Sequence, residues 1–146
     1  MKTRTVSHVL QTKGYELYSV RSEEPVLSAL QEMADRNIGA LVVLDDSALV
    51  GVITERDCVR KLDIEGRSAE SARVGEIMER RVTTVRSDQT IDECLRLMTE
   101  LRVRHLPVVD DGLVGLISIG DVGKALITEQ ERLIDDLTGF ITGSPR

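Results

Sequence analysis

The chain has 146 residues, of which 41% are hydrophobic and 30% charged, and its formal net charge at pH 7 is −6. This balance excludes a disordered or membrane-spanning chain, because no apolar run approaches the roughly 18 residues that a membrane span needs. The acidic charge would repel a phosphate backbone, and 2% aromatic residues with no Trp offer little for bases to stack on. The N-terminal stretch "MKTRTVSHVLQTKGYE" lacks the apolar segment of a signal peptide. We therefore predict a globular cytoplasmic protein, with neither nucleic acid nor membrane as a partner.

The first half of the chain has the pattern of a strand, a helix, a hairpin and a second helix. The extended segment "ELYSV" at 16–20 leads to Ser22, a candidate N-cap. Apolar side chains at 3–4 spacing then predict one buried helical stripe: Val26, Ala29, Leu30, Met33 and Ala34. "ALVVL" and "LVGVI" flank the turn "DDSA", which predicts a hairpin, and a helix is expected from about Asp57. The polar segment 63–73 is the expected linker.

The second half repeats the first. "RVTTV" leads to Ser87, and a second stripe follows: Ile91, Cys94, Leu95, Met98 and Leu101. "HLPVV" and "LVGLI" then flank "DDG", with a helix expected from about Asp121. Residues 19–62 align with 84–126 when Ala48 is left unmatched, and "VSHVL" at 6–10 resembles "VGEIM" at 74–78. We predict an α+β protein of two β-α-β-β-α repeats that pack about a pseudo-twofold axis.

Nothing in the sequence favours catalysis. The carboxylate pairs Asp45-Asp46 and Asp110-Asp111 fall in hairpin turns, where Asp suits the turn geometry. No GxSxG, HExxH, GxxxxGK[ST] or GxGxxG motif is present. His8 has no companions at metal-ligand spacing, and the stripe makes Cys94 a core residue.

Each hairpin ends in a hydroxyl three residues before a carboxylate: Thr54 with Asp57, and Ser118 with Asp121. A carboxylate at a helix start can accept hydrogen bonds from adjacent hydroxyls of a sugar such as ribose. Thr, Ser or Asp at a helix start is equally an ordinary N-cap. The recurrence of the pair in both repeats favours a ligand site.

These residues, within "ELYSVRSEEPVLSALQEMADRNIGALVVLDDSALVGVITERDC" and "VTTVRSDQTIDECLRLMTELRVRHLPVVDDGLVGLISIGDV", resemble the CBS domain family, named for cystathionine β-synthase. The resemblance implies a stand-alone CBS pair, with repeats at 6–66 and 74–128 and a helical extension at 129–146. Such pairs are regulatory sensors that bind adenosine-containing ligands (AMP, ADP, ATP, NAD, S-adenosylmethionine) in two clefts between the repeats. The ligand expected here is AMP, ATP or NAD, with no catalytic cofactor, and the output would act on an unidentified protein partner in trans. A protein-interaction scaffold without a nucleotide ligand is the alternative.

Carried over residue by residue, the resemblance implies two crossed clefts. In one, the adenine is lined from the first repeat while the ribose and phosphates are held from the second: Tyr18, Val20, Ile38, Gly39 and Ala40 with Ser118, Asp121, Arg104 and His105. The other cleft exchanges the roles of the repeats: Thr83, Val85, Val103 and Arg104 with Thr54, Arg56 and Asp57. Pro107 fits an edge strand open to ligand.

The two clefts cannot carry equal charge. Gly39-Ala40 in the first repeat aligns with Arg104-His105 in the second, and Arg56 aligns with Gly120. Arg104 is the better phosphate ligand, because its guanidinium stays charged and forms paired hydrogen bonds. His105 is either a phosphate contact or a strand-end histidine bonded to backbone.

The last helix is expected to outlast the repeat and to run from Asp121 to Ile141. Its stripe comprises Val122, Leu126, Leu133, Ile134, Leu137 and Ile141. A homodimer would bury that stripe, and the alternative is that the helix folds back on its own core.

Overall fold

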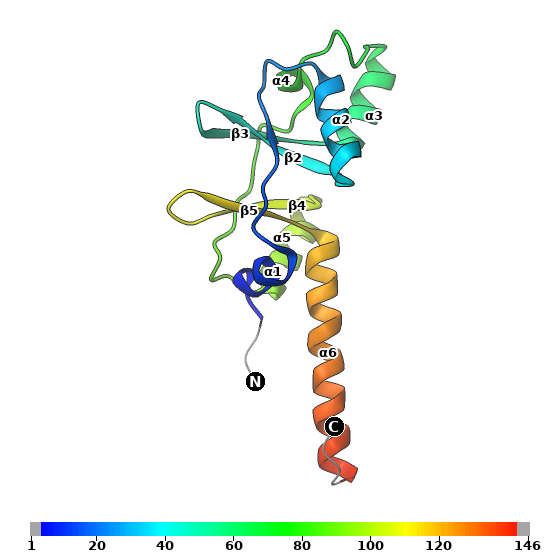
Figure 1. Cartoon of the computed structure of the whole chain (residues 1–146). Helices are drawn as coiled ribbons and strands as arrows, with labels where there is room; N and C mark the ends of the chain where they lie inside the picture. Colours follow the sequence, from blue (N-terminus) through cyan, green and yellow to red (C-terminus); the bar gives the residue numbers. More distant parts are fainter. Residues whose placement is uncertain (1–3, 143–146) are drawn as a thin grey trace. The chain divides into compact units, whose positions relative to one another are not determined.

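The computed structural model describes residues 4–142, without the side chains of 139–142. The chain forms two compact units, and one of them is assembled from both ends of the sequence (Figure 1). Residues 16–83 form the first, which we call the 16–83 unit. Residues 84–142 form the second together with the N-terminal segment up to Tyr15, and we call it the 84–142 unit.

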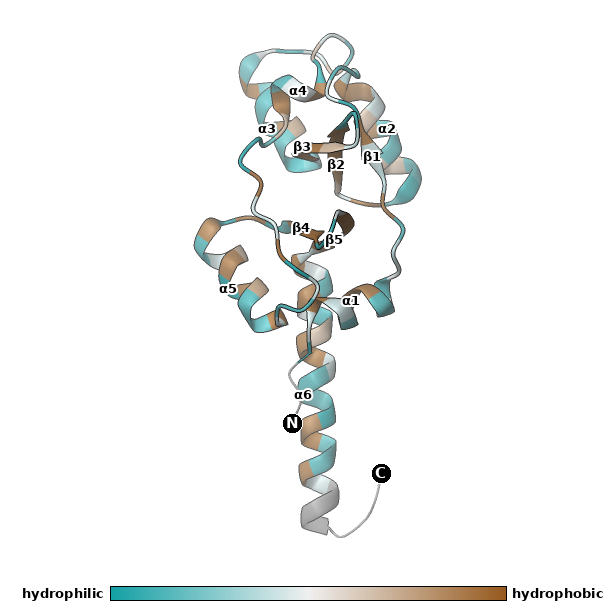
Figure 2. Cartoon of the chain, turned by 90° about the vertical axis from the view of Figure 1, so that its left-hand side faces the viewer, coloured by the Kyte–Doolittle hydropathy of each residue, from teal (hydrophilic) through white to brown (hydrophobic). Residues whose placement is uncertain are grey.

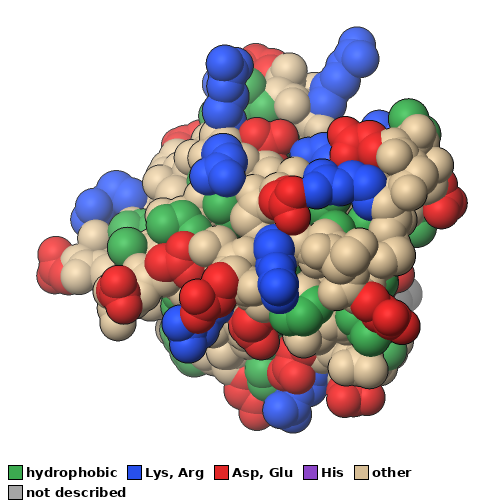
Figure 3. Space-filling view, turned by 90° about the horizontal axis from the view of Figure 1, so that it is seen from above, with side chains coloured by type: hydrophobic (Ala, Val, Ile, Leu, Met, Phe, Trp, Pro, Cys, Tyr) green, Lys and Arg blue, Asp and Glu red, His purple; other side chains and the backbone are tan. Residues whose placement is uncertain are grey.

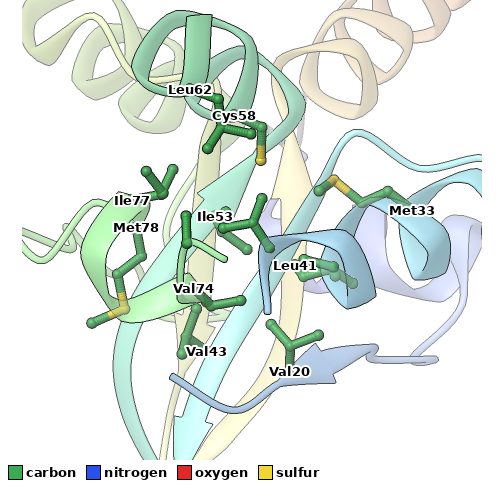
Figure 4. Close-up of a cluster of buried hydrophobic side chains, with 13 residues drawn as sticks. Val20, Met33, Leu41, Val43, Ile53, Cys58, Leu62, Val74, Ile77 and Met78 are labelled. Atoms are coloured by element: carbon green, nitrogen blue, oxygen red, sulfur yellow. The ribbon is translucent and has the colours of Figure 1, made fainter. Parts of the chain in front are cut away.

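The 16–83 unit has a three-stranded sheet in the order β1-β2-β3. Its elements are β1 (Ser19–Val20), α2 (Val26–Arg36), β2 (Ala40–Asp45), β3 (Ala48–Thr54), α3 (Glu55–Glu65) and α4 (Val74–Ile77). β1 pairs parallel with β2, which pairs antiparallel with β3. Asp46 and Ser47 join the hairpin with φ values of 49° and 68°, as a two-residue turn of the primed type requires. Side chains from the sheet and the helices fill a single core (Figure 4).

The 84–142 unit has a two-stranded antiparallel sheet of β4 (His105–Val109) and β5 (Leu113–Ser118). Its helices are α1 (Val6–Lys13), α5 (Ile91–Leu101) and α6 (Ile119–Thr142). The predicted strand "RVTTV" is reduced to a parallel bridge between Val85 and Val108. The β-α-β-β-α order is therefore complete in the 16–83 unit and has a vestigial first strand in this one.

Pro107 explains that difference, and the expectation that it marks an open edge is wrong. β4 is flanked on both sides, because the Val85 amide donates to the Pro107 carbonyl at 3.0 Å and the Val109 amide donates to the Val85 carbonyl at 2.8 Å. In a parallel ladder the amide of residue 107 would pair next with the carbonyl of Thr83. Proline has no such amide, so the ladder stops.

The predicted N-caps Ser22 and Ser87 are also wrong. α2 begins after Pro25, and α5 begins after Thr90, whose hydroxyl accepts from the Glu93 amide. Ser22 instead donates its backbone amide and its hydroxyl to the Asp45 carboxylate, and the Ser87 amide donates to Asp110 at 3.0 Å. These hairpin aspartates therefore also hold the segment before α2 or α5 against the sheet of its unit.

The helical stripes are confirmed at most positions. Val26, Ala29, Met33, Ile91, Cys94 and Met98 are buried, and Leu30 and Leu95 pack against the cores. Ala34 is exposed and Leu101 is 49% exposed, because each lies close to the end of its helix. The segment 63–73 is not a free linker, since α3 continues to Glu65 and Ala72 is buried in the core.

In each unit a short helix, α1 or α4, or the residues just after it contact the hairpin at a glycine. A Cβ at Gly115 would lie 2.7 Å from Leu10 Cδ2 of α1. A Cβ at Gly51 would lie 2.5 Å from Met78 Sδ and 2.9 Å from the Glu79 carbonyl oxygen. Leu10 and Met78 are equivalent in the match between "VSHVL" and "VGEIM", so the same contact occurs in both units.

α6 packs on its unit only near its start. Val122 is buried and Leu126 packs against the core, whereas Ile127, Ile134 and Leu137 are 57%, 61% and 53% exposed. Hydrophobic and hydrophilic residues alternate along the part of the helix that extends away from α1 and α5 (Figure 2). Of the predicted stripe, Ile134 and Leu137 do not fold back on the core, Leu133 is partly buried, and the side chain of Ile141 lies outside the described ones. None of the helices within residues 4–142 is both long and apolar enough to cross a membrane.

Candidate ligand site

In the 16–83 unit, candidate residues at the start of β2 and at the end of β3 lie next to each other. We call Gly39, Ala40, Thr54 and Asp57 the Thr54 half-site. Ala40 and Thr54 are paired across the β2–β3 ladder, and the Glu55 amide donates to the Gly39 carbonyl at 3.0 Å. Thr54 is the N-cap of α3 and accepts from the Asp57 amide at 3.0 Å. The helix start, predicted at about Asp57, lies two residues earlier.

The Ser118 half-site, defined as Arg104, His105, Ser118 and Asp121, repeats this arrangement in the 84–142 unit. His105 and Ser118 are paired across the β4–β5 ladder, and the Ile119 amide donates to the Arg104 carbonyl at 2.8 Å. The Asp121 amide donates to Ser118 Oγ at 3.1 Å, and the Ser118 amide donates to Asp121 Oδ2 at 2.8 Å. This reciprocal pair caps the start of α6.

Capping and ligand binding are therefore compatible. Thr54 and Ser118 use their hydroxyls as helix caps, as predicted by the alternative that these residues are ordinary N-caps. In the Thr54 half-site the cap uses only the backbone amide of Asp57. No hydrogen bond or ion pair reaches the Asp57 carboxylate from residues within the described 4–142, so this group can accept hydrogen bonds from a ligand.

Asp121 has a partner that the sequence did not reveal. Lys13 Nζ, in the last turn of α1, lies 2.7 Å from Asp121 Oδ2 and donates to the Leu116 carbonyl at 2.5 Å. Partial burial raises the pKa of Asp121, but the bonds from Lys13 and Ser118 outweigh it and the pKa lies below its usual value. The only signal for Lys13 was the match of "VSHVL" with "VGEIM", which relates the segment carrying Lys13 to the other repeat.

The remaining candidates differ in what they can offer. Val20, Ala40, Val85 and Pro107 have buried side chains, so only their backbone groups could face a ligand. Ile38 and Val103 pack partly against the cores, Thr83 is partly buried, and Arg56 and Arg104 are exposed. His105 is partly buried.

Tyr18 lies in a small polar network of the 16–83 unit. Arg36 lies over its ring, 4.5 Å from the centroid, and its hydroxyl donates to Glu16 Oε2 at 2.5 Å. The hydrogen bond to Glu16 raises the pKa of Tyr18. An adenine stacked on Tyr18 would therefore contact a ring that Arg36 already contacts.

One face of the molecule mixes the two signs of charge. Figure 3 shows Lys and Arg side chains interspersed with Asp and Glu over one face of the molecule. Within the described residues, no three His, Cys, Asp or Glu side chains are grouped to hold a metal ion.

Comparison with known proteins shows which family the chain belongs to. The family model described as CBS domain matches residues 6–64 and again residues 74–128. The chain belongs to the CBS domain family. The predicted CBS pair is thereby confirmed, as is its α+β fold class.

Individual CBS proteins agree with this assignment. The CBS domain-containing protein CBSX3, mitochondrial, of Arabidopsis thaliana is 37% identical over 152 residues, which cover 97% of this chain and 74% of that protein. A structure from Burkholderia ambifaria MC40-6, a CBS-domain protein for which a signal-transduction role has been proposed, is 45% identical. It covers 86% of this chain and 96% of its own, with a TM-score of 0.83. The CBS pair of MJ0100, solved with 5′-methylthioadenosine and S-adenosyl-L-methionine, is 25% identical. It covers 88% of this chain and 99% of its own, with a TM-score of 0.76.

Proposed function

We propose that this CBS pair is a regulatory sensor that binds an adenosine-containing ligand (AMP, ATP or NAD) and acts on a protein partner in trans. The observation that carries the proposal is the recurrence of one geometry in both units. In each, a strand-end hydroxyl caps a helix and an aspartate follows three residues later. The related pair of MJ0100, which binds adenosine compounds, supports the ligand class.

The polar groups of each half-site suit a nucleoside. A carboxylate with a free oxygen accepts hydrogen bonds from the adjacent ribose hydroxyls, and such charge-assisted bonds are stronger than neutral ones. The backbone of 38–40 and of 103–105, to which the family resemblance assigns the adenine, can bond the edge of a base.

A thermal-shift screen of the purified protein against AMP, ATP, NAD, S-adenosylmethionine and 5′-methylthioadenosine tests the proposal. A ligand that binds only the native state stabilises it by about 2.7 kcal/mol at a hundredfold excess over Kd. No shift with any of the five, at millimolar concentration, would contradict nucleotide sensing and favour a scaffold.

Substitution of the two aspartates tests the site itself. Asp57→Ala is expected to lower affinity by roughly ten- to a hundredfold, the cost of a lost charged acceptor, without destabilising the fold. Asp121→Ala should lower affinity similarly and also destabilise α6, because Asp121 bonds the Ser118 amide and Lys13. Calorimetry on Asp57→Asn distinguishes charge from shape. Unchanged affinity in both alanine variants would return these residues to a purely structural role.

The exposed stripe on α6 favours an association partner, and we propose a homodimer through this helix. Ile127, Ile134 and Leu137 of α6 are large apolar side chains that are more than half exposed. The second candidate function, an interaction scaffold, rests on the same surface. Catalysis is not part of the proposal, and the cytoplasm stays a prediction, since the relative CBSX3 is named as mitochondrial.

A further inference from the structure

The ion pair between Lys13 and Asp121 gives the Ser118 half-site a basic group from the far end of the sequence. Lys13 Nζ lies 2.7 Å from Asp121 Oδ2, and the two side chains are only 35% and 19% exposed. The same ammonium donates to the Leu116 carbonyl at 2.5 Å. Because β5 and α1 both hold it, Lys13 is fixed beside the carboxylate.

The bonds at Asp121 leave room for a ligand. Oδ2 accepts from both Lys13 and the Ser118 amide, at 2.7 and 2.8 Å. Among residues 4–142, none bonds Oδ1, so this oxygen is available to a sugar hydroxyl. An ammonium has three donors. Two of those of Lys13 are used, and the third has no partner in the described chain.

The Thr54 half-site lacks this compensation. The residue equivalent to Lys13 is Arg81, by the match that relates Leu10 to Met78. The Arg81 amide donates to Glu79, but its exposed guanidinium bonds nothing within the described residues. Asp57 therefore has no ion-pair partner among the described residues, and the acidic Glu55 lies on the same helix turn.

We propose that Lys13 makes the Ser118 half-site selective for an adenosine ligand that bears phosphate, by neutralising the ribose-binding Asp121. This inference rests on the proposed function and assigns a ligand class to one half-site. A carboxylate that binds a ribose also lies near the 5′-phosphate of the same nucleotide, and like charges at that range repel. Lys13 removes the repulsion, whereas the Asp57 carboxylate retains it and favours a neutral or cationic adenosine compound.

AMP and adenosine, which differ only in the phosphate, form the matched pair of probes. Calorimetry on the full chain compares the wild type with Lys13→Met, which keeps the apolar stem, and with Lys13→Arg, which keeps the charge. We expect Lys13→Met to weaken AMP binding by about three- to tenfold and adenosine binding by less than about twofold, as expected for a partly exposed charge. Lys13→Arg should retain the preference for AMP. The matched control Arg81→Met should leave both affinities unchanged.

The outcomes separate this inference from the proposed function. Equal loss of AMP and adenosine affinity in Lys13→Met would show that Lys13 only positions Asp121 and would overturn the selectivity. A wild type that binds neither compound would overturn both. If Lys13→Met fails to fold, the salt dependence of binding by the wild type is measured instead. Raising the salt concentration from about 50 to 200 mM must weaken AMP binding more than adenosine binding. An equal response would refute the inference.

Discussion

Among the described glycines, Gly51 is the one at which an added methyl group would meet the closest contacts. The new methyl group would lie 2.5 Å from Met78 Sδ and 2.9 Å from the Glu79 carbonyl oxygen. The sulfur belongs to a flexible side chain and can move, but the carbonyl belongs to backbone. That backbone is held to β3 by two hydrogen bonds, from the Val52 amide at 3.1 Å and to the Val52 carbonyl at 2.9 Å. Relief of the clash therefore requires this bridge to lengthen or break.

The cost can be bounded from these contacts. Overpacking a tight site typically costs about 1–3 kcal/mol, and each net hydrogen bond contributes about 0.5–1.5 kcal/mol. We expect Gly51→Ala to lower the free energy of unfolding by about 2–3 kcal/mol, or the Tm by about 4–10 °C for a chain of this length. Gly115→Ala should cost less, about 1–2 kcal/mol, because its nearest atom at 2.7 Å is a methyl of the Leu10 side chain.

Urea unfolding followed by circular dichroism measures these differences. Gly112→Ala is the matched control, since nothing lies within 4 Å of its Cβ position. A Gly51→Ala protein as stable as the control, or more stable than Gly115→Ala, would refute the argument that α4 and the chain after it are held against β3.

Four further outcomes are expected. A chain ending at Thr128 should be monomeric in light scattering while the full chain is dimeric, and a monomeric full chain rules the dimer out. Cys58 and Cys94, whose pKa values burial raises to about 11, should react with a thiol reagent at pH 8 only after unfolding, and fast reaction in the native state would contradict their burial. Arg104→Ala should weaken AMP binding more than adenosine binding, and equal losses would mean that Arg104 shapes the site without contacting phosphate. The lowered pKa of Asp121 stabilises the fold above its unfolded value of about 3.9, and this contribution is lost as the pH falls through the lower folded value. Melting temperatures measured across that range should therefore drop less steeply in Asp121→Asn.

Periodicity predicted the repeats and the buried stripes, because spacing alone determines which helical face is apolar. It failed for Ser22 and Ser87, since a serine before a helix has the same sequence signature whether it caps the helix or bonds a distant aspartate. Asp45 lies 23 residues from Ser22 in sequence, and only the folded hairpin brings the two together.

The candidate site was likewise predicted where it depends on a local pattern and missed where it depends on a distant partner. Thr54, Asp57, Ser118 and Asp121 follow from a local pattern that both repeats share. Lys13 does not, because its partner Asp121 is 108 positions away and neither residue carries a local signal for the other. For Pro107 the residue type correctly indicated a missing hydrogen bond in the sheet. The sequence did not show that the bond would be lost on the side of β4 that faces Val85.

The assembly of the 84–142 unit from both ends of the chain affects the order in which the protein folds during synthesis. Residues 16–83 are contiguous and can fold once they have left the ribosome. α1 emerges before residues 84–142, and its apolar side chains Val6, Val9 and Leu10 belong to a core completed only by strands and helices of that later segment. At roughly 5–20 residues per second, that helix stays without its partners for several seconds. The nascent chain thus carries an exposed apolar segment until residues up to Val122 have been made, and in this period chaperone binding or mispairing with another nascent chain competes with folding.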